Sequence, residues 1–391
     1  MSDGTLQTLD ITMLDDVGTG ANQLIQLDSN AKIPACSAAA VTNLPGITKS
    51  SSDPTISTNP SGGVGTVYQN TTSGEMYVCT DATAGANVWT NVGAGSGDVE
   101  PWTFQGTQYG YATGGYTGGY RNDIQKYSLS SDANGTDVGD LLATRRPDSS
   151  QADDGSYGFS TGTSSGTYIN VIERFSFLSD GNSTDWADLS AVAGQGATAH
   201  NQTHGYYGGV GNAAYSSGID KFPLASQTNG TDIGNLTVGR DMTDGCSSAT
   251  YGFAMGGSTP YSNVIDKWSF SADGNATDHG DLLFYMENNG ACSSTTHGYV
   301  VAGYAGSPSP TGNINTIQKF QFASNSNATD VGDMITTRKN TSGASSTTHG
   351  YSAGGNTNTN GIEKFSFTTD GNATDVADLI VGLYGSGSNS Y

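Results

Sequence analysis

The chain has 391 residues and a formal net charge of −22, with 14 Lys and Arg against 36 Asp and Glu. An acidic excess of this size repels phosphate backbones, which argues against a nucleic-acid partner. No apolar run approaches the roughly 18–20 residues needed to cross a bilayer, and the first residues lack the basic and apolar regions of a signal peptide, so no membrane insertion is expected.

Residues 1–49 form the first predicted segment. Within it, Asp16–Pro34 suggests one short strand between turns, too little to bury a core. The sequence of Gly18–Asp28, GTGANQLIQLD, resembles a segment of bacteriophage tail-fibre proteins that forms part of a slender trimeric stalk. One departure is Ala31, where the family has glycine before Lys32. The resemblance implies a virion protein, a homotrimer, and attachment to other virion (tail) proteins through the N-terminus.

Residues 50–100 are predicted to hold a linker and a small β module. Residues 50–65 have the composition of a linker, and Gly65–Asp81 alternates around a Ser-Gly turn as a hairpin does. Asn87–Val92 supplies a third strand, and Gly93–Asp98 is a flexible joint. The module is similar to ones that stand between stalk and tip in phage structural proteins.

Residues 101–391 contain one unit repeated six times. Each copy has a Gly-aromatic strand, a variable loop, an alternating strand, a polar turn, and a Ser/Thr-rich strand. The pairs that mark copies 1 to 6 are Thr136-Asp137, Thr184-Asp185, Thr231-Asp232, Thr277-Asp278, Thr329-Asp330 and Thr374-Asp375.

The size of the unit, a few short strands with turns between them, is that of one propeller blade. The array resembles kelch repeats, which share a glycine pair followed by an aromatic strand; such pairs stand here at Gly114-Gly115, Gly208-Gly209, Gly256-Gly257 and Gly354-Gly355. The usual spacing of Tyr and Trp after the glycines is not kept. We therefore expect an all-β fold: a six-bladed kelch-like β-propeller preceded by a stalk-like segment and a small β-hairpin module.

The alternating strand carries a base in every copy. Because both faces of a blade are covered by neighbours, these bases need carboxylate partners, and the Asp of each Thr-Asp pair is the predicted one. The bases are Lys126, Arg174, Lys221, Lys267, Lys319 and Lys364, and the predicted partners are Asp137, Asp185, Asp232, Asp278, Asp330 and Asp375.

The turn before each Thr-Asp pair, Asp273–Asp278 in copy 4, is rich in oxygen atoms and resembles a calcium loop. Asp and Asn in such turns also bond their own backbone, and copies with Gln227 or Asn325 lack the first carboxylate. The sequence favours an Asx-type turn, and no metal or cofactor is predicted.

No catalytic residues are predicted. His204, His297 and His349 occupy a repeat position that Tyr fills in the other copies, which indicates packing. The arginines are scattered, and no nucleophile–base pair is apparent.

The layout of stalk, small module, joint and repeat array is that of a virion appendage, and the tail-fibre resemblance implies that its far end binds a host surface glycan or protein. The variable loops are the expected binding surface. Their candidate sugar-stacking residues are Tyr116, Tyr120, Tyr168, Tyr215, Tyr261 and Tyr304. Two alternatives stay open: a head or tail decoration protein without receptor binding, and a surface-polysaccharide hydrolase.

Overall fold

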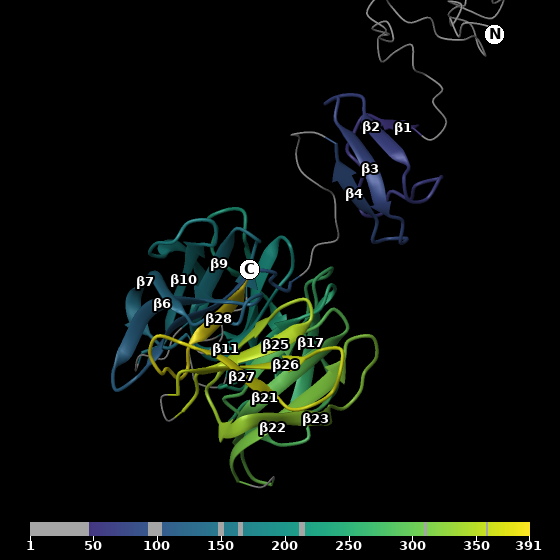
Figure 1. Ribbon diagram of the computed structural model, residues 1–391. Helices are drawn as coiled ribbons and strands as arrows, with labels where there is room; N and C mark the ends of the chain where they lie inside the picture. Colours follow the sequence, from purple (N-terminus) through teal and green to yellow (C-terminus); the bar gives the residue numbers. More distant parts are fainter. Residues whose placement is uncertain are drawn as a thin grey trace, which may run out of the picture. The chain divides into compact units, whose positions relative to one another are not determined.

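The computed structural model describes residues 47–92, 104–147, 152–162, 167–210, 216–308, 311–356 and 359–391 (Figure 1). Every element in these residues is a β-strand, so the all-β expectation is confirmed and no described helix could span a membrane. The chain divides into two compact units, Met1–Pro101 and Trp102–Tyr391. The tail-fibre-like stretch, in residues 1–46, lies outside the described residues.

The first unit is a four-stranded sheet in the order β1 (Ile47–Ser50), β2 (Val67–Asn70), β3 (Met76–Asp81), β4 (Val88–Asn91). Alternate residues point into its core, where Tyr77 and Trp89 are fully buried. Residues 51–65, within the predicted linker, have no strand and connect β1 to β2. The buried Asn87 side chain donates to Ile56 O at 2.8 Å and to Asn59 Oδ1 at 3.0 Å, which fastens that segment to the sheet.

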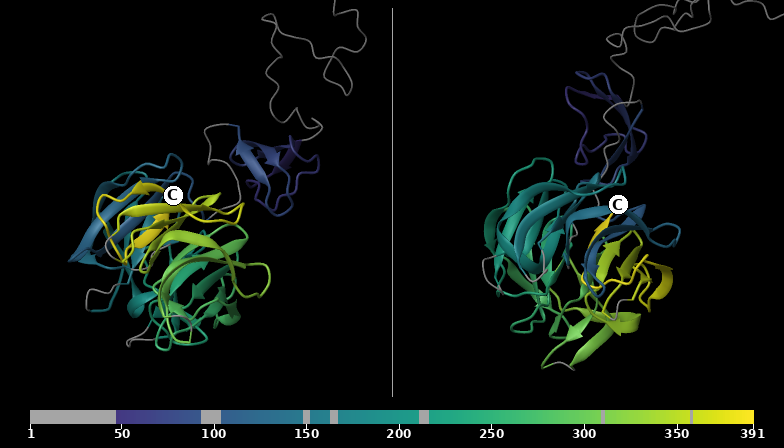
Figure 2. Two further views of the ribbon diagram at one scale, coloured as in Figure 1. Left: turned by 60° about the horizontal axis from the view of Figure 1, so that its bottom comes forward. Right: turned by 90° about the vertical axis from the view of Figure 1, so that its left-hand side faces the viewer.

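The strands of the second unit follow the six sequence copies, and the strands of each copy are called one sheet below (Figures 1 and 2). Sheets 2 and 3 are continuous with each other, because both include part of β11 and together form a seven-stranded sheet. Sheet 1 is β28 (Gly387–Ser390), β5 (Tyr109–Tyr116), β6 (Tyr120–Ser128) and β7 (Thr136–Arg145). Sheet 2 is β8 (Ala152–Asp153), β9 (Tyr157–Thr161), β10 (Ile169–Ser176) and the first part of β11 (Thr184–His200). Sheet 3 is the last part of β11, β12 (His204–Val210), β13 (Gly218–Pro223) and β14 (Thr231–Asn235).

Sheets 4 to 6 repeat this order. Sheet 4 is β15 (Asp244–Ser247), β16 (Tyr251–Met255), β17 (Val264–Ser269) and β18 (Thr277–Asp281). Sheet 5 is β19 (Met286–Glu287) and β20 (Gly290–Ser293), both beside β21 (His297–Ala305), then β22 (Gly312–Gln321) and β23 (Thr329–Arg338). Sheet 6 is β24 (Ser342–Ser345), β25 (His349–Ala353), β26 (Gly361–Ser366) and β27 (Thr374–Asp378).

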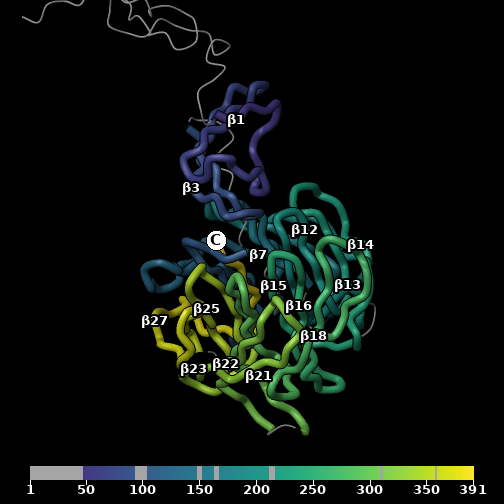
Figure 3. Tube along the Cα trace, turned by 90° about the vertical axis from the view of Figure 1, so that its right-hand side faces the viewer, coloured from purple at the N-terminus to yellow at the C-terminus, as the bar shows by residue number. Residues whose placement is uncertain are grey.

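The first strand of each sheet contacts the first strands of two other sheets. The contacts form a closed series, β28 to β8 to β11 to β15 to β20 to β24 and back to β28. Figure 3 traces the chain through the second unit from β7 past β15 and β21 to β27. The sheet that closes the series combines both ends of the unit, since β28 pairs with β5 from Gly387 opposite Thr113 to Ser390 opposite Gly110. We call these six strands the inner strands.

The polar turn of each copy holds the sheet before it. In all six copies the turn Asn accepts a hydrogen bond at 3.0–3.1 Å from a main-chain N–H of the preceding copy, and copy 1 holds copy 6 in the same way. The asparagines are Asn134, Asn182, Asn229, Asn275, Asn327 and Asn372. The turn therefore links neighbouring copies, and we call its contacts with the preceding copy the latch.

The strand bases belong to the same latch, and their predicted partners are wrong. Four lysines pair with the first Asp of the next copy's turn: Lys126–Asp180, Lys221–Asp273 and Lys319–Asp370 at 2.5 Å, and Lys364–Asp132 at 2.6 Å. Lys267 donates to Asn325 at 2.7 Å, because that copy lacks the carboxylate. In copy 3, Gln227 stands where four other turns have the Asp that pairs with the base. Arg174 lies instead over the rings of Tyr157 and Trp186.

Strand register explains why the Thr-Asp carboxylates do not pair with the bases. Lys126 stands opposite Thr136, whereas Asp137 stands opposite Gln125 and so faces the other side of the sheet. Asp137 instead accepts the main-chain N–H of Gly139 at 3.2 Å. The same register recurs at Asp185, Asp232, Asp278, Asp330 and Asp375.

Removing one latch lysine has a small expected effect. Lys364→Met loses the pair with Asp132, but the Asp132 side chain is 39% exposed, so the free energy of unfolding should fall by at most about 1 kcal/mol, and by less in high salt. Lys267→Met is the matched control, since its partner Asn325 is uncharged and its cost should not depend on salt. Urea unfolding at low and high salt measures both. A loss of several kcal/mol in Lys364→Met would contradict this account.

A second set of contacts between copies lies on the buried side of the same strands. The residue before each base is buried and accepts a main-chain N–H from the preceding copy. These residues are Gln125, Glu173, Asp220, Asp266, Gln318 and Glu363.

Three buried arginines join this set with a period of two copies. Arg145 pairs with Glu173 at 3.0 Å, Arg240 with Asp266 at 3.0 Å, and Arg338 with Glu363 at 3.1 Å. The equivalent positions of copies 2, 4 and 6 are Ala193, Met286 and Leu383. The arginines that look scattered in the sequence thus mark every second junction between copies.

Candidate binding site

The inner strands end in two different hollows of the second unit. The last residues of the six inner strands enclose a small space of about 10 Å³, which has room for no more than one water molecule. The residues just before the inner strands line a larger one of about 510 Å³. Only the larger hollow has room for a ligand.

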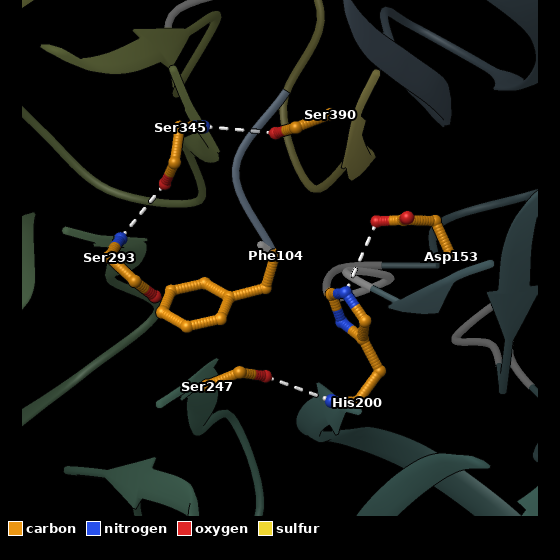
Figure 4. A pocket seen from close by; sticks show the side chains of 7 residues that line it. All are labelled: Phe104, Asp153, His200, Ser247, Ser293, Ser345 and Ser390. Carbon is orange, nitrogen blue, oxygen red and sulfur yellow. Dashed lines mark hydrogen bonds and ion pairs between the residues drawn. The ribbon is translucent and has the colours of Figure 1, made fainter. Parts of the chain in front are cut away.

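The small space is ringed by one polar residue from each inner strand and filled by Phe104, as Figure 4 shows. His200 Nε2 lies 3.2 Å from Asp153 Oδ2, and the Ser247 hydroxyl accepts the main-chain N–H of His200 at 2.9 Å. This grouping of Ser, His and Asp has the composition of a catalytic triad. Its residues are buried and leave no space for a substrate, so the arrangement closes this end of the fold.

The larger space, which we call the polar hollow, is lined by residues of all six copies. All but Asn356 stand one or two residues after the repeat position that holds the buried arginines. They are Arg146, Gln195, Met242, Glu287, Asn288, Lys339, Asn340, Asn356 and Tyr384.

The floor of the polar hollow is fixed by main-chain hydrogen bonds from copy to copy. Asn288 N donates to Met242 O at 3.0 Å, Asn340 N to Asn288 O at 2.7 Å, and Gly385 N to Asn340 O at 2.9 Å. These four residues have φ values of 55° to 66°, a conformation that Gly and Asn adopt most readily. The Asn340 amide also donates to Asn288 Oδ1 at 2.6 Å. The hollow is therefore a preformed surface.

One side of the polar hollow carries an aromatic group that includes two predicted tyrosines. The ring of Tyr384 lies 5.2 Å from that of Tyr116, which in turn lies 5.3 Å from that of Tyr120. The Arg146 guanidinium lies 5.0 Å from the centre of the Tyr384 ring. Tyr120 is 38% exposed, so this group presents an aromatic edge to solvent.

A second aromatic group holds Lys339. Its ammonium lies 4.6 Å from the centre of the Tyr304 ring, and Tyr304 stacks with Tyr261 at 6.3 Å. Lys339 is held further by Asn356, whose side chain accepts its main-chain N–H at 2.8 Å. Tyr304, one of the predicted tyrosines, thus contacts the lining residue Lys339, and Tyr261 contacts Tyr304.

The remaining predicted tyrosines differ. The Tyr168 hydroxyl donates to Asp241 at 3.0 Å, and Asp241 also accepts the N–H of Gln195, so Tyr168 supports the lining from behind. Tyr215 lies outside the described residues. Tyr116 and Tyr304 thus contact lining residues, Tyr120 and Tyr261 contact those two tyrosines, and none of the predicted tyrosines lines the hollow itself.

Sequence reasoning missed the lining residues Arg146, Lys339, Tyr384, Asn288 and Asn340. Their repeat positions hold varied residue types, with only Asn288 and Asn340 alike at one position, so they leave no motif common to the six copies. The available signal was positional, because variation at one place in an otherwise regular unit is typical of a binding surface.

The three histidines of the repeat position lie beside the latch lysines. Burial and the neighbouring ammonium of Lys221, Lys319 or Lys364 lower the pKa of His204, His297 and His349. The unfolded chain then binds protons near pH 6.5 that the folded chain does not, so stability falls as the pH drops through this range.

Replacing all three histidines by Tyr, the residue of copies 1, 2 and 4, should remove this part of the pH dependence. Urea unfolding at pH 7.5 and pH 5 should show a smaller loss of stability on acidification in the variant than in the parent chain. Equal losses would mean that other groups control the acid sensitivity.

Comparison with known proteins gives no relative: no protein-family model matches the chain, and no curated protein matches it.

Proposed function

We propose that residues 102–391 form a six-bladed kelch-like β-propeller that serves as the recognition domain of a phage tail fibre. Support for the architecture comes from the closed series of inner strands and from latches that link copy 6 to copy 1 as they link every other pair. Pairing of β28 with β5 in one sheet joins the two ends, as ring closure requires.

The observation that carries the binding role is the polar hollow. It has about 510 Å³ of open space, a floor fixed by main-chain hydrogen bonds, amide and charged groups for hydrogen bonding, and tyrosine rings at its edge. Flat aromatic rings next to amide and charged side chains suit the alternating apolar and hydroxylated faces of a sugar. The proposed ligand is a glycan of the host cell surface.

The proposal that the chain is part of a virion is supported by the resemblance of Gly18–Asp28 to tail-fibre sequences. In this proposal the N-terminus attaches to other tail proteins, the assembled form is a homotrimer, and the repeat domain is displayed at the free end. In the decoration-protein alternative, the same domain would contact only other virion proteins.

The test is competition between the purified full chain and intact virions for host cells. The chain should bind the cells and reduce adsorption, and Tyr384→Ala should weaken both effects because it removes the ring that joins Arg146 to Tyr116. Lys267→Met, remote from the lining residues in the sequence repeat, should behave like the parent chain. A folded chain that neither binds nor competes would refute the receptor-binding role.

A further inference from the structure

The distribution of positive charge in the second unit is uneven. Six of its twelve bases occupy the latch position, three are the buried arginines, and Arg121 pairs with Asp123 at 2.6 Å. The two bases outside these sets, Arg146 and Lys339, both line the polar hollow. Arg146 and Lys339 thus bring two positive charges to one hollow in a chain of net charge −22.

The two cations flank one aromatic residue. Arg146 belongs to copy 1 and Lys339 to copy 5, and copy 6, which contacts both neighbours, places Tyr384 between them. The cations are held in place, Arg146 over the Tyr384 ring and Lys339 over the Tyr304 ring. The hollow also offers Gln195, Asn288 and Glu287, which suit hydroxyl groups. Glu287 lies on the same side as Lys339, because it pairs with Tyr304 between strands and Lys339 lies over the Tyr304 ring.

We propose that the polar hollow binds an acidic sugar residue of the uronic-acid class. Its carboxylate is placed between Arg146 and Lys339, its ring lies against Tyr384, and its hydroxyls face Asn288 and Glu287. A guanidinium recognises a carboxylate through paired hydrogen bonds, and the ammonium adds a second charge contact.

The negative charge of the whole chain sharpens this recognition. Long-range repulsion disfavours a densely charged polyanion, whereas the local cations favour a single carboxylate that enters the hollow. The expected ligand is therefore a polysaccharide with acidic residues spaced by neutral ones. This inference rests on the proposed function and specifies its ligand.

The experiment is an array of bacterial surface polysaccharides, each printed in its native form and after chemical reduction of its carboxyl groups to alcohols. The full chain should bind acidic members, and reduction should weaken binding by about tenfold or more, the effect of losing a charged hydrogen bond. Arg146→Gln and Lys339→Gln should each lower binding to the native form by a similar factor and leave binding to the reduced form unchanged. Lys126→Gln removes the same charge outside the hollow and should leave both unchanged.

The outcomes separate this inference from the function beneath it. Equal binding to native and reduced forms, lost in the Tyr384→Ala chain, would overturn the acidic ligand and leave glycan recognition standing. Binding to host cells without binding to any polysaccharide would overturn the acidic sugar and point to a protein receptor. Binding to neither would overturn both proposals.

Discussion

Asp266→Ala should lower the free energy of unfolding of the second unit by about 3–5 kcal/mol. Arg240 and Asp266 have no exposed side-chain surface, and their atoms lie 3.0 Å apart. Without the carboxylate, the guanidinium is left in a buried position with Ser262, Val264 O and Ala254 O as its partners, none of them charged. Burial lowers the pKa of Arg240 and raises that of Asp266, because removal from water disfavours the charged form of each group.

The chain itself supplies the matched controls. Asp220 occupies the same repeat position without an arginine partner and bonds Ser190 instead, so Asp220→Ala should cost less, about 1–3 kcal/mol. The double substitution R240M/D266Q copies the junction of Met286 with Gln318 and should recover most of the loss. Urea unfolding measures all three. If the double variant is as unstable as Asp266→Ala, the loss does not come from an unpaired buried charge.

Removal of residues 386–391 should prevent the second unit from unfolding as one cooperative structure. The deletion removes β28, exposes the paired edge of β5, and breaks contacts to two other sheets: Ser388 to Gly343 O at 2.6 Å and Asn389 to Ala152 O at 2.8 Å. An unpaired, apolar edge strand also favours aggregation.

A synthetic peptide of residues 383–391 added to the truncated chain should restore a cooperative transition, and a scrambled peptide should not. Circular dichroism during urea unfolding and size-exclusion chromatography measure the outcome. A truncated chain that stays monomeric and unfolds at the parental urea concentration would show that closure by β28 contributes little.

The repeats allowed the strands to be predicted well, because each copy combines period-two alternation with a fixed polar turn. The expected strand around Lys267, for example, is β17. The small module also has strands where the alternation of Val67–Asn70 and Met76–Asp81 predicts them.

Contacts between copies were harder to predict. The repeat shows that Lys126 and Asp137 recur together, but not that register turns them to opposite faces or that Asp180 comes from the next sheet. The polar hollow shows the same limit. Arg146 and Lys339 are far apart in sequence and occupy positions without a repeated residue type, so only the arrangement of the six sheets brings them to one site.

The alternation of buried arginines has a consequence for how this array is inherited. A copy that carries a buried Arg needs Glu or Asp in the next copy, as Arg145 of copy 1 pairs with Glu173 of copy 2. At the junction of copies 4 and 5, Met286 contacts the uncharged Gln318. Loss of copy 4 alone would set Arg240 against Gln318, and loss of copy 6 alone would set Arg338 against Gln125, so that a buried arginine would lack a carboxylate. Loss of two adjacent copies would leave every remaining arginine with an acidic partner, so relatives of this chain should lose copy 4 or copy 6 only together with a neighbouring copy.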